Sequence, residues 1–509
     1  MRWSVLAVFC AAAATCAWAA DSVREGDRYE IREAKLGRLH NQNVFCVTLS
    51  PDGSRIAYLT GAQGGAAFVV DGVVGPTYDN LTEPVFSPDG RRTANCAEKR
   101  GQWCVVVDGV PGAFYDSISD EGPVFSADSR RIAYAARKGT TWRAVVDDVA
   151  EREYDGVSGL CLAPDGSRAA YGACRGAKWL VVTDGADGPL YDAIQDETPL
   201  FSADSRRVAY VATKGTEHVA VVEGVEGEPF DLVGKPVFSQ DGSRLAYVAE
   251  EDKKQFVVVD GEPGPKYDGV EPLVAFGPNS ERLAYVAGRG GKEFVVVDGV
   301  EGPEYDGIMD GAVWFSRDAK RLAYVAQRAD KAVVVIDGVE GPEFDGVLSS
   351  GVLFSPEGGH VVYVGGRGDS QFMVTDGVER AVSDVVVNGT VAFDSTGNHL
   401  AYLAVTSGPK MRAVLDGRNG QEYDAIGGVV FGAESRIELA PGLAFSPQGA
   451  DLAYFADDGQ NRFVVVDGKV GPKYDLVLGS RPKWDPDGVI EYLAVRAGDL
   501  YRVRHVPAK

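Results

Sequence analysis

Two short sequence phrases alternate along nearly the whole of this 509-residue chain. The first is aromatic-Ser-x-Asp-(Gly/Ser)-x-Arg-apolar-Ala-Tyr, as in Phe238 to Tyr247. It occurs twelve times, in steps of 37 to 39 residues with a single step of 52. The second is Val-Val-Val-Asp-Gly-x-x-Gly-Pro-x-(Tyr/Phe)-Asp, as in Val257 to Asp268, and it occurs eleven times. A fixed period of this length indicates an array of equal structural units.

Each unit is predicted to contain four short strands, a to d, because its apolar runs are short, rich in Val, Tyr and Phe, and separated by Gly, Pro and Asp. In one unit these strands are 313–315, 321–326, 332–336 and 343–347. Strand c is apolar on consecutive residues, so both of its faces should be buried. The units must therefore stack face to face, which predicts an all-β fold, a β-propeller of about twelve four-stranded blades.

Twelve blades exceed the usual four to eight of one ring. Two propellers of about six blades each, in residues 20–270 and 271–509, are the simplest arrangement, and a single large ring is the alternative. The last unit, 482–506, lacks the second phrase. Residues 28–36 are predicted to supply its missing outer strand and to close a ring. The long step reflects a twelve-residue insertion near 425–440, predicted to lie between strand d of one unit and strand a of the next.

The repeated polar residues have structural explanations. Ser-Pro-Asp-Gly suits a type I turn between strands a and b, and Asp-Gly suits a tight turn between c and d. Within the first turn we expect Asp89 to pair with Arg92, with equivalent pairs in other units. His360 and His399 stand where other units have this Arg. A residue present in every unit is a poor candidate for a single active site.

The phrase Leu49 to Tyr58, Leu-Ser-Pro-Asp-Gly-Ser-Arg-Ile-Ala-Tyr, and the phrase Phe238 to Tyr247 resemble the TolB-type propeller repeat, a relative of the WD repeat. The resemblance covers roughly residues 40 to 505. It implies a propeller of four-stranded blades that acts in protein–protein contact, since such repeats serve periplasmic scaffolds, peptidase-associated propellers and lyases. The second phrase is not part of the usual TolB-type pattern, so the partners of TolB are not carried over.

The amino-terminal sequence indicates where the protein is located, and the net charge of the chain limits its possible partners. Residues 1–19 have one basic residue, Arg2, an apolar run and Ala17-Trp18-Ala19, an order typical of a cleaved signal peptide. We therefore expect a periplasmic or secreted protein, and we find no later apolar stretch long enough to cross a bilayer. With 51 basic and 74 acidic residues the net charge is −23, which disfavours a nucleic-acid partner.

Five cysteines follow the predicted signal peptide: Cys46, Cys96, Cys104, Cys161 and Cys174. Their spacing matches no zinc motif. An exported protein permits a disulfide, and Cys96 and Cys104 fall on adjacent strands of one hairpin. The alternative is that all five are small buried apolar residues.

Antiparallel strands place the a–b and c–d turns on one face, the a–b face, and the b–c turns with the d–a connections on the other, the b–c face. The b–c face varies from unit to unit, as expected of a binding surface on a repeated scaffold. Its b–c turns are basic, whereas some d–a connections, such as Asp120-Glu121 and Asp196-Glu197, are acidic. The candidate binding residues are Arg137, Lys138, Arg289, Lys292, Arg328, Lys331 and Arg367.

These observations favour an exported binding or scaffold protein without catalysis. Its partner on the b–c face would be a protein or an anionic envelope polymer. The pattern indicates no catalytic residue, no metal ligand and no cofactor. The alternative function is a propeller hydrolase or lyase acting on a polysaccharide or peptide, with carboxylates around the centre of the ring.

Overall fold

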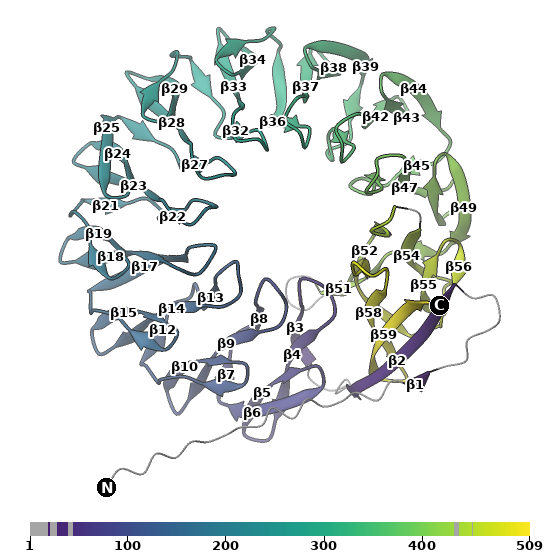
Figure 1. The fold of residues 1–509 in the computed structure, drawn as a ribbon, viewed down its shortest axis with the longest axis horizontal. Coiled ribbons are helices and arrows are strands. Elements are labelled where there is room, and N and C mark those ends of the chain that lie inside the picture. The colour runs from purple at the N-terminus through teal and green to yellow at the C-terminus, as the bar shows by residue number, and fades with distance from the viewer. Residues whose placement is uncertain (1–18, 21–27, 39–43, 432–436, 450, 509) are drawn as a thin grey trace.

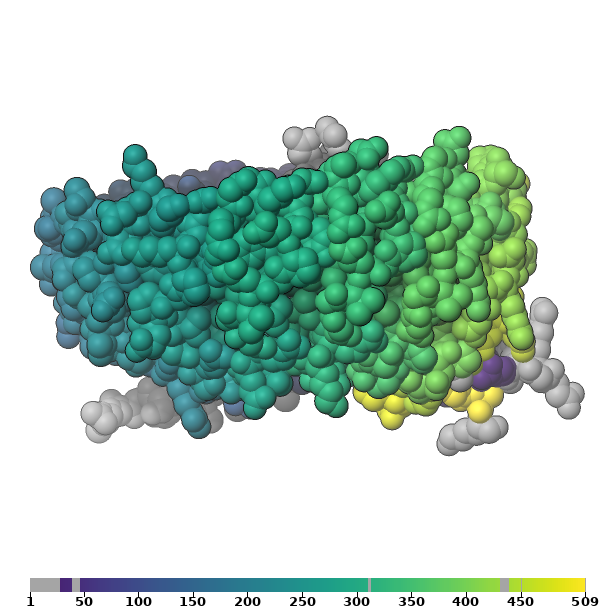
Figure 2. Space-filling view, turned by 90° about the horizontal axis from the view of Figure 1, so that it is seen from above, coloured from purple at the N-terminus to yellow at the C-terminus, as the bar shows by residue number. Residues whose placement is uncertain are grey.

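The structure is a computed structural model that describes residues 19–20, 28–38, 44–431, 437–449 and 451–508. These residues form strands and no helix, and the strands make twelve mainly antiparallel sheets. The sheets stand side by side as the blades of one closed ring (Figure 1). Seen from the side, the ring is wider than it is deep (Figure 2). The predicted all-β propeller of about twelve blades is confirmed, whereas the arrangement as two six-bladed rings is wrong.

Blade 3 illustrates the anatomy of a blade. Its innermost strand a is split into β12 (Ser117–Ile118) and β13 (Val124–Phe125), and both pieces pair with strand b, β14 (Ile132–Lys138). Strand c is β15 (Thr141–Val146), and strand d, on the outer side, is β16 (Val149–Ala150). The twelve blades span residues 44–78, 80–111, 117–150, 156–187, 193–230, 232–263, 269–301, 307–344, 346–382, 385–423, 425–470, and 476–507 with 29–38.

The core lies between the blades. Strand b and the end of strand c are buried on both faces, as the continuous apolar runs predict. Strand b carries an Ala that is fully buried in ten of the twelve blades, for example Ala133 and Ala284. In nine of these ten blades the next residue is a Tyr that inserts between blades, for example Tyr134 at 1% exposure, and in blade 2 it is Asn95. Alternation of small and large side chains lets neighbouring sheets approach closely and fill the space between them.

The ring closes through the amino-terminal strand. β2 (Tyr29–Arg38) pairs along its length with β59 (Asp499–Pro507) and so becomes the outer strand of blade 12. In Figure 1 this strand, in purple, lies beside the yellow strands of the carboxyl terminus. Blade 12 in turn packs on blade 1, where Leu478 and Leu493 contact Ile56 and Tyr58. The predicted closure by the segment after residue 28 is confirmed.

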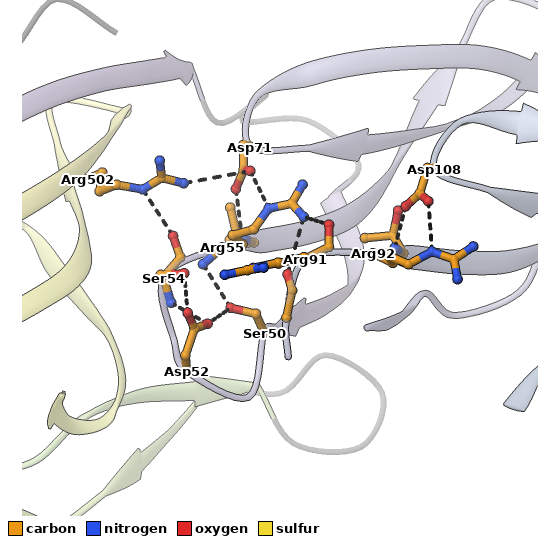
Figure 3. Close-up of polar contacts among 12 residues, drawn as sticks. Ser50, Asp52, Ser54, Arg55, Asp71, Arg91, Arg92, Asp108 and Arg502 are labelled. Atoms are coloured by element: carbon orange, nitrogen blue, oxygen red, sulfur yellow. Dashed lines mark hydrogen bonds and ion pairs between the residues drawn. The ribbon is translucent and has the colours of Figure 1, made fainter. Parts of the chain in front are cut away.

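The first repeated phrase builds a joint on the a–b face. Arg55 donates its Nε hydrogen to Asp71 of the c–d turn at 2.8 Å, and its Nη1 donates to the backbone oxygen of Arg91 in the next blade (Figure 3). Arg92 repeats the arrangement with Asp108. The predicted pair of Asp89 with Arg92 is therefore wrong. Asp89 instead accepts the hydroxyl hydrogen of Ser87 at 2.6 Å, because the short turn holds those two side chains together.

The two histidines in the Arg position take over the same contact. His360 Nδ1 lies 2.6 Å from Asp376, and His399 Nδ1 lies 2.7 Å from Asp416. In each case the hydrogen bond to the carboxylate raises the pKa of the imidazole. Both carboxylates also accept the backbone amide of strand b, as their counterparts do in other blades. These histidines therefore keep the contact with the c–d turn within their own blades.

The second repeated phrase builds a joint on the b–c face. Its final Asp accepts a backbone amide from the b–c turn of the following blade: Asp116 from Gly139, Asp306 from Ala329, at 2.6 and 2.7 Å. The same contact recurs from Asp79 to Asp475 around the ring. Both repeated phrases thus supply side chains that connect one blade to the next.

The interruption of strand a places its acidic residues elsewhere than predicted. In blade 3 the interruption is 119–123, between two pieces that both pair with strand b. Asp120 and Glu121 therefore lie on the inner side of the ring, midway along the blade, and not in a d–a connection. Glu121 accepts the amide of Gly159 in the neighbouring blade. We call these interruptions the inner belt.

The insertion in blade 11 also belongs to the inner belt. It separates β50 (Ala425–Ile426) from β53 (Leu443–Phe445), and both of these pair with β54 (Leu452–Asp457). The inserted residues include the antiparallel pair β51 (Gly428–Phe431) and β52 (Ile437–Ala440). Val429, 1% exposed, bridges in parallel to Leu478 of blade 12 and joins the core between blades 12 and 1. The insertion therefore helps to seal the seam, by which we mean the junction of blades 12 and 1.

Blade 11 has Asp451 where most blades have the Arg of the first joint. Its c–d turn residue, Asp467, therefore faces another carboxylate, and Arg28 from the amino-terminal segment lies between them. The Arg28 Nη atoms are 2.7 Å from Asp451 and 2.5 Å from Asp467. Tyr29 donates its hydroxyl hydrogen to Asp451. Burial, and then contact with Asp451, raises the pKa of Asp467 to about 6.

This pair predicts a pH dependence of stability. Asp467 binds a proton more tightly in the folded state than in the unfolded chain, where its pKa is about 4. Its contribution to the free energy of unfolding should therefore increase as pH falls from about 7 towards 4. In Asp451→Asn, Arg28 and Tyr29 keep an oxygen partner, but the repelling charge is gone. Because the burial of Asp467 remains in the variant, we expect it to gain roughly 0.5 kcal/mol less than the parent between pH 7 and 5.

The measurement is chemical unfolding of both proteins at a series of pH values. Subtracting the two curves removes the titration of all other groups. Parallel curves would contradict the assignment of this titration to the pair.

Candidate binding surface

The seven candidate cations all lie at the b–c turns, as predicted, and five of them pair within the protein. Arg289, Arg328 and Arg367 contact Glu301, Glu340 and Glu379 of their own strand d at 2.5 to 2.6 Å. Lys292 and Lys331 contact Asp306 and Asp345, the final residues of the second phrase, at 2.5 and 2.6 Å.

Aromatic rings hold the guanidinium groups further. The centre of the Arg367 guanidinium is 4.3 Å from the Phe344 ring, and Arg289 lies 5.2 Å from Phe294. Cations in these positions attract the ring faces as well as the carboxylates. The positive charges of these arginines and lysines in blades 7 to 9 are thus neutralised by neighbouring carboxylates. Their b–c turns therefore present little net charge to a partner.

Blades 2 and 3 differ because the partner acids are missing. In blade 7, Arg289 is the last cation of strand b, and its partner Glu301 lies twelve positions later. At the same spacing, Lys99 of blade 2 is followed by Pro111 and Lys138 of blade 3 by Ala150. Lys138 makes no ion pair with any residue that the structure describes, and Arg137 donates only to the backbone oxygen of Gly139 at 3.2 Å. Two of the seven predicted residues, Arg137 and Lys138, therefore remain available.

A cavity of about 510 Å³ opens between the same two blades. The indole of Trp103 and the side chains of Ile118 and Val85 provide its apolar surface. Glu83, Asp120 and Glu121 of the inner belt, all exposed, provide its acidic wall. The cavity is adjacent to the free cations, because Ser117 in its lining pairs in register with Arg137.

This surface was only partly predicted. Arg137 and Lys138 were among the candidates, whereas Trp103 and Glu83 were not, and Asp120-Glu121 was assigned to the wrong part of the blade. The missing acids at positions 111 and 150 are a sequence signal that distinguishes blades 2 and 3. The cavity has no such signal, since it forms from two blades whose interrupted strands happen to face each other.

The cysteines near this cavity are thiols. None of the five described cysteines forms a disulfide. Register places Cys96 opposite Val105 and Cys104 opposite Ala97, so the two side chains point to opposite faces of the sheet and the disulfide that spacing left open does not form. Burial raises the pKa of Cys96, which lines the cavity, to about 11. A thiol with such a pKa is a poor nucleophile at neutral pH.

The described part of the chain holds neither a metal cluster nor a membrane-spanning helix. No three of its His, Cys, Asp or Glu side chains gather as a metal site would require. Nor does this part contain a helix that could span a membrane. The predicted signal peptide lies outside the described residues, except for Ala19.

No protein-family model and no curated protein matches the sequence. Solved structures align with parts of the chain at low similarity. A eukaryotic initiation factor aligns with 67% of this chain and 95% of its own at 12% identity and a TM-score of 0.35. The β-propeller domain of the Trilobed protease from Pyrococcus furiosus aligns over 52% and 95% at 14% identity and 0.26. TolB from Acinetobacter baumannii aligns over 50% and 77% at 12% identity and 0.22. The predicted resemblance to TolB-like and WD-type propellers holds for the fold alone.

Proposed function

We propose that this protein is an exported scaffold that binds a protein partner through blades 2 and 3 on the b–c face and catalyses no reaction. The observation that carries the proposal is the cavity beside Trp103, bordered by cations that have no acid of their own. Elsewhere the repeated polar side chains are used to connect blades.

The chemistry of the surface suits a protein partner. Protein interfaces combine a buried aromatic or aliphatic anchor with a charged rim, and Trp and Arg are enriched at the positions that contribute most. Here the cavity accepts an apolar side chain, and Arg137 and Lys138 attract an acidic patch beside it. An anionic polymer would bind the cations but leave the apolar surface of the cavity unused.

The proposal predicts that charge in blade 3 matters and that equal charge in blade 7 does not. The mature protein is used to capture partners from envelope extract of its own organism, beside Arg137→Ser/Lys138→Ser and the control Arg289→Ser/Lys292→Ser. Both variants lose two positive charges from the same face. We expect the first variant to retain about tenfold less of a partner that the parent and the control retain equally, which corresponds to about 1.4 kcal/mol.

A photo-crosslinking residue at position 119 locates the contact. It should yield a covalent adduct with the captured protein, and the same residue at position 290 should not. Equal loss of the partner from both charge variants, or crosslinking from position 290 alone, would overturn the proposed surface. Capture of a polysaccharide instead of a protein would overturn the class of partner.

A further inference from the structure

Two departures from the repeat meet at one cavity. The cavity, about 180 Å³, lies at the seam and is lined by the β51 residue Val430, by Ser50 and Asp52 of blade 1, and by Arg481, Lys483 and Glu491 of blade 12. The insertion of blade 11 thus forms one wall, and β57 (Leu476–Trp484) and β58 (Ile490–Arg496) form another. Positions that break a repeat where the fold does not require it are candidates for function.

The first departure is a charged row in blade 12. In blade 7, Ala275, Ala284 and Val297 are direct neighbours across strands a, b and c. In blade 12 the equivalent neighbours are Lys483, Glu491 and Arg504. Glu491 replaces the Ala of strand b, which is fully buried in the other blades that have it. A carboxylate at such a position is costly unless it is paired.

Glu491 is paired within the blade. Its two carboxylate oxygens lie 3.5 Å from Arg502 Nε and 3.1 Å from Arg504 Nε. Arg502 also donates to the backbone oxygen of Ser54 and approaches Asp71 of blade 1 (Figure 3). In blade 12, Val489 occupies the position that the first-joint Arg has in other blades. Arg502 makes the equivalent contact with blade 1 at the seam. This part of the row therefore has a structural explanation.

Lys483 has no such explanation. Its ammonium group makes no hydrogen bond or ion pair with any described residue, although the side chain is half-buried. Burial lowers the pKa of Lys483, attraction to the carboxylate of Asp52 opposes this shift, and repulsion from Arg481 adds to it. The carboxylate of Asp52, which faces it across the cavity, already accepts hydrogen bonds from Ser50 and Ser54. Lys483 and Arg481 thus line the cavity together with Asp52 and Glu491, and Lys483 forms no ion pair with either carboxylate.

We propose that this cavity binds a small free oxyanion, a phosphate or a short-chain carboxylate, between Lys483 and Arg481. A guanidinium group offers two parallel donors to such an anion, and an ammonium group adds a point charge. The half-buried position of Lys483 strengthens its interaction with an anion relative to water. The volume admits a small anion and excludes a polymer, so this site is independent of the protein-binding surface in blades 2 and 3.

The test is calorimetric titration of the full mature chain with inorganic phosphate and, separately, with succinate. We expect saturable binding of at least one of them by the parent. Lys483→Met and Arg481→Gln should each weaken binding at least tenfold, or about 1.4 kcal/mol. Arg481 is exposed, so its variant should fold even if Lys483→Met does not. Lys253→Met is the control, because Lys253 also lacks an ion pair among the described residues but lies far away in blade 6.

Thermal unfolding separates this role from a merely structural one. A ligand that binds only the native state raises the unfolding temperature, and the effect grows with the logarithm of its concentration above Kd. Phosphate or succinate should therefore stabilise the parent and the Lys253 variant but not the variants at 481 and 483. Absence of binding by the parent at about ten millimolar of either anion, a concentration at which a millimolar site would be saturated, would overturn the proposal. Unchanged affinity in both cavity variants would also overturn it.

Discussion

Replacing Ala34 by aspartate is expected to open the ring. Ala34 is 1% exposed on β2, the strand that completes blade 12, and it pairs in register with Arg502. A carboxylate there has no room in the core, and its cross-strand neighbour Arg502 is already engaged with Glu491 and the backbone oxygen of Ser54, so we expect a loss of about 3 kcal/mol or more. The loss should concentrate on the pairing of β2 with β59, because the other eleven blades contain no residue from the amino terminus.

Two measurements check this result. Guanidinium unfolding followed by tryptophan fluorescence should show an earlier transition that Trp484, in blade 12, reports, and small-angle scattering should show an expanded particle. Arg38→Asp, at the exposed end of the same strand, is the control and should behave as the parent. A ring of unchanged size and stability in Ala34→Asp would mean that β2 is dispensable for closure.

Replacing Asp337 tests the first joint. Asp337 lies at the start of a c–d turn with φ of 52°, and its carboxylate accepts from Arg321 at 2.9 Å and from the amide of Leu322 at 2.9 Å. Arg321 donates onward to Gly359 of the next blade. Asp337→Ala loses both hydrogen bonds and also forces alanine into left-handed backbone, so we expect a cost of about 2 to 3 kcal/mol.

Two further substitutions separate the contributions. Asp337→Gly removes the side chain but accepts the positive φ, so it should cost less than alanine. Asp337→Asn tolerates the same φ and keeps one acceptor, so it should cost least. Equilibrium unfolding of the three variants gives the order directly. Equal costs for glycine and alanine would show that the backbone conformation contributes nothing.

The repeat predicted a great deal because each turn and strand is defined locally. The positions of strands b and c follow from apolar runs, and turns follow from Asp-Gly and Ser-Pro-Asp-Gly, which the structure confirms. The pairing of Asp89 with Arg92 was wrong because the side chain of Arg92 reaches across the sheet to Asp108, a residue brought near only by the c–d hairpin. In a sheet, strand pairing brings side chains that are distant in sequence into contact, so sequence separation alone does not predict which charged residues form an ion pair.

For the candidate binding surface, too, the sequence predicted where the cations lie, and the tertiary structure decided which of them are paired. Arg137 and Lys138 are predicted from the sequence as charged turn residues, but Lys138 lacks an acidic partner because Ala150, two strands away in the same blade, occupies the position where other blades have an acid. The other five candidates lost their free charge to acids that strand pairing places beside them. The capture experiment with the serine variants of blades 3 and 7 tests whether the paired cations contribute to binding.

The sequence by itself determined the blade, the number of blades and the strand that completes the last of them, because period, polarity and turn chemistry are properties of neighbouring residues. Only the tertiary structure decided that twelve blades form one ring, that the inner belt carries the acids and that the insertion seals the seam. The angle between blades depends on how every small and large side chain of one sheet fits the next. No single repeat contains that information, since closure is the sum of twelve such contacts around the ring.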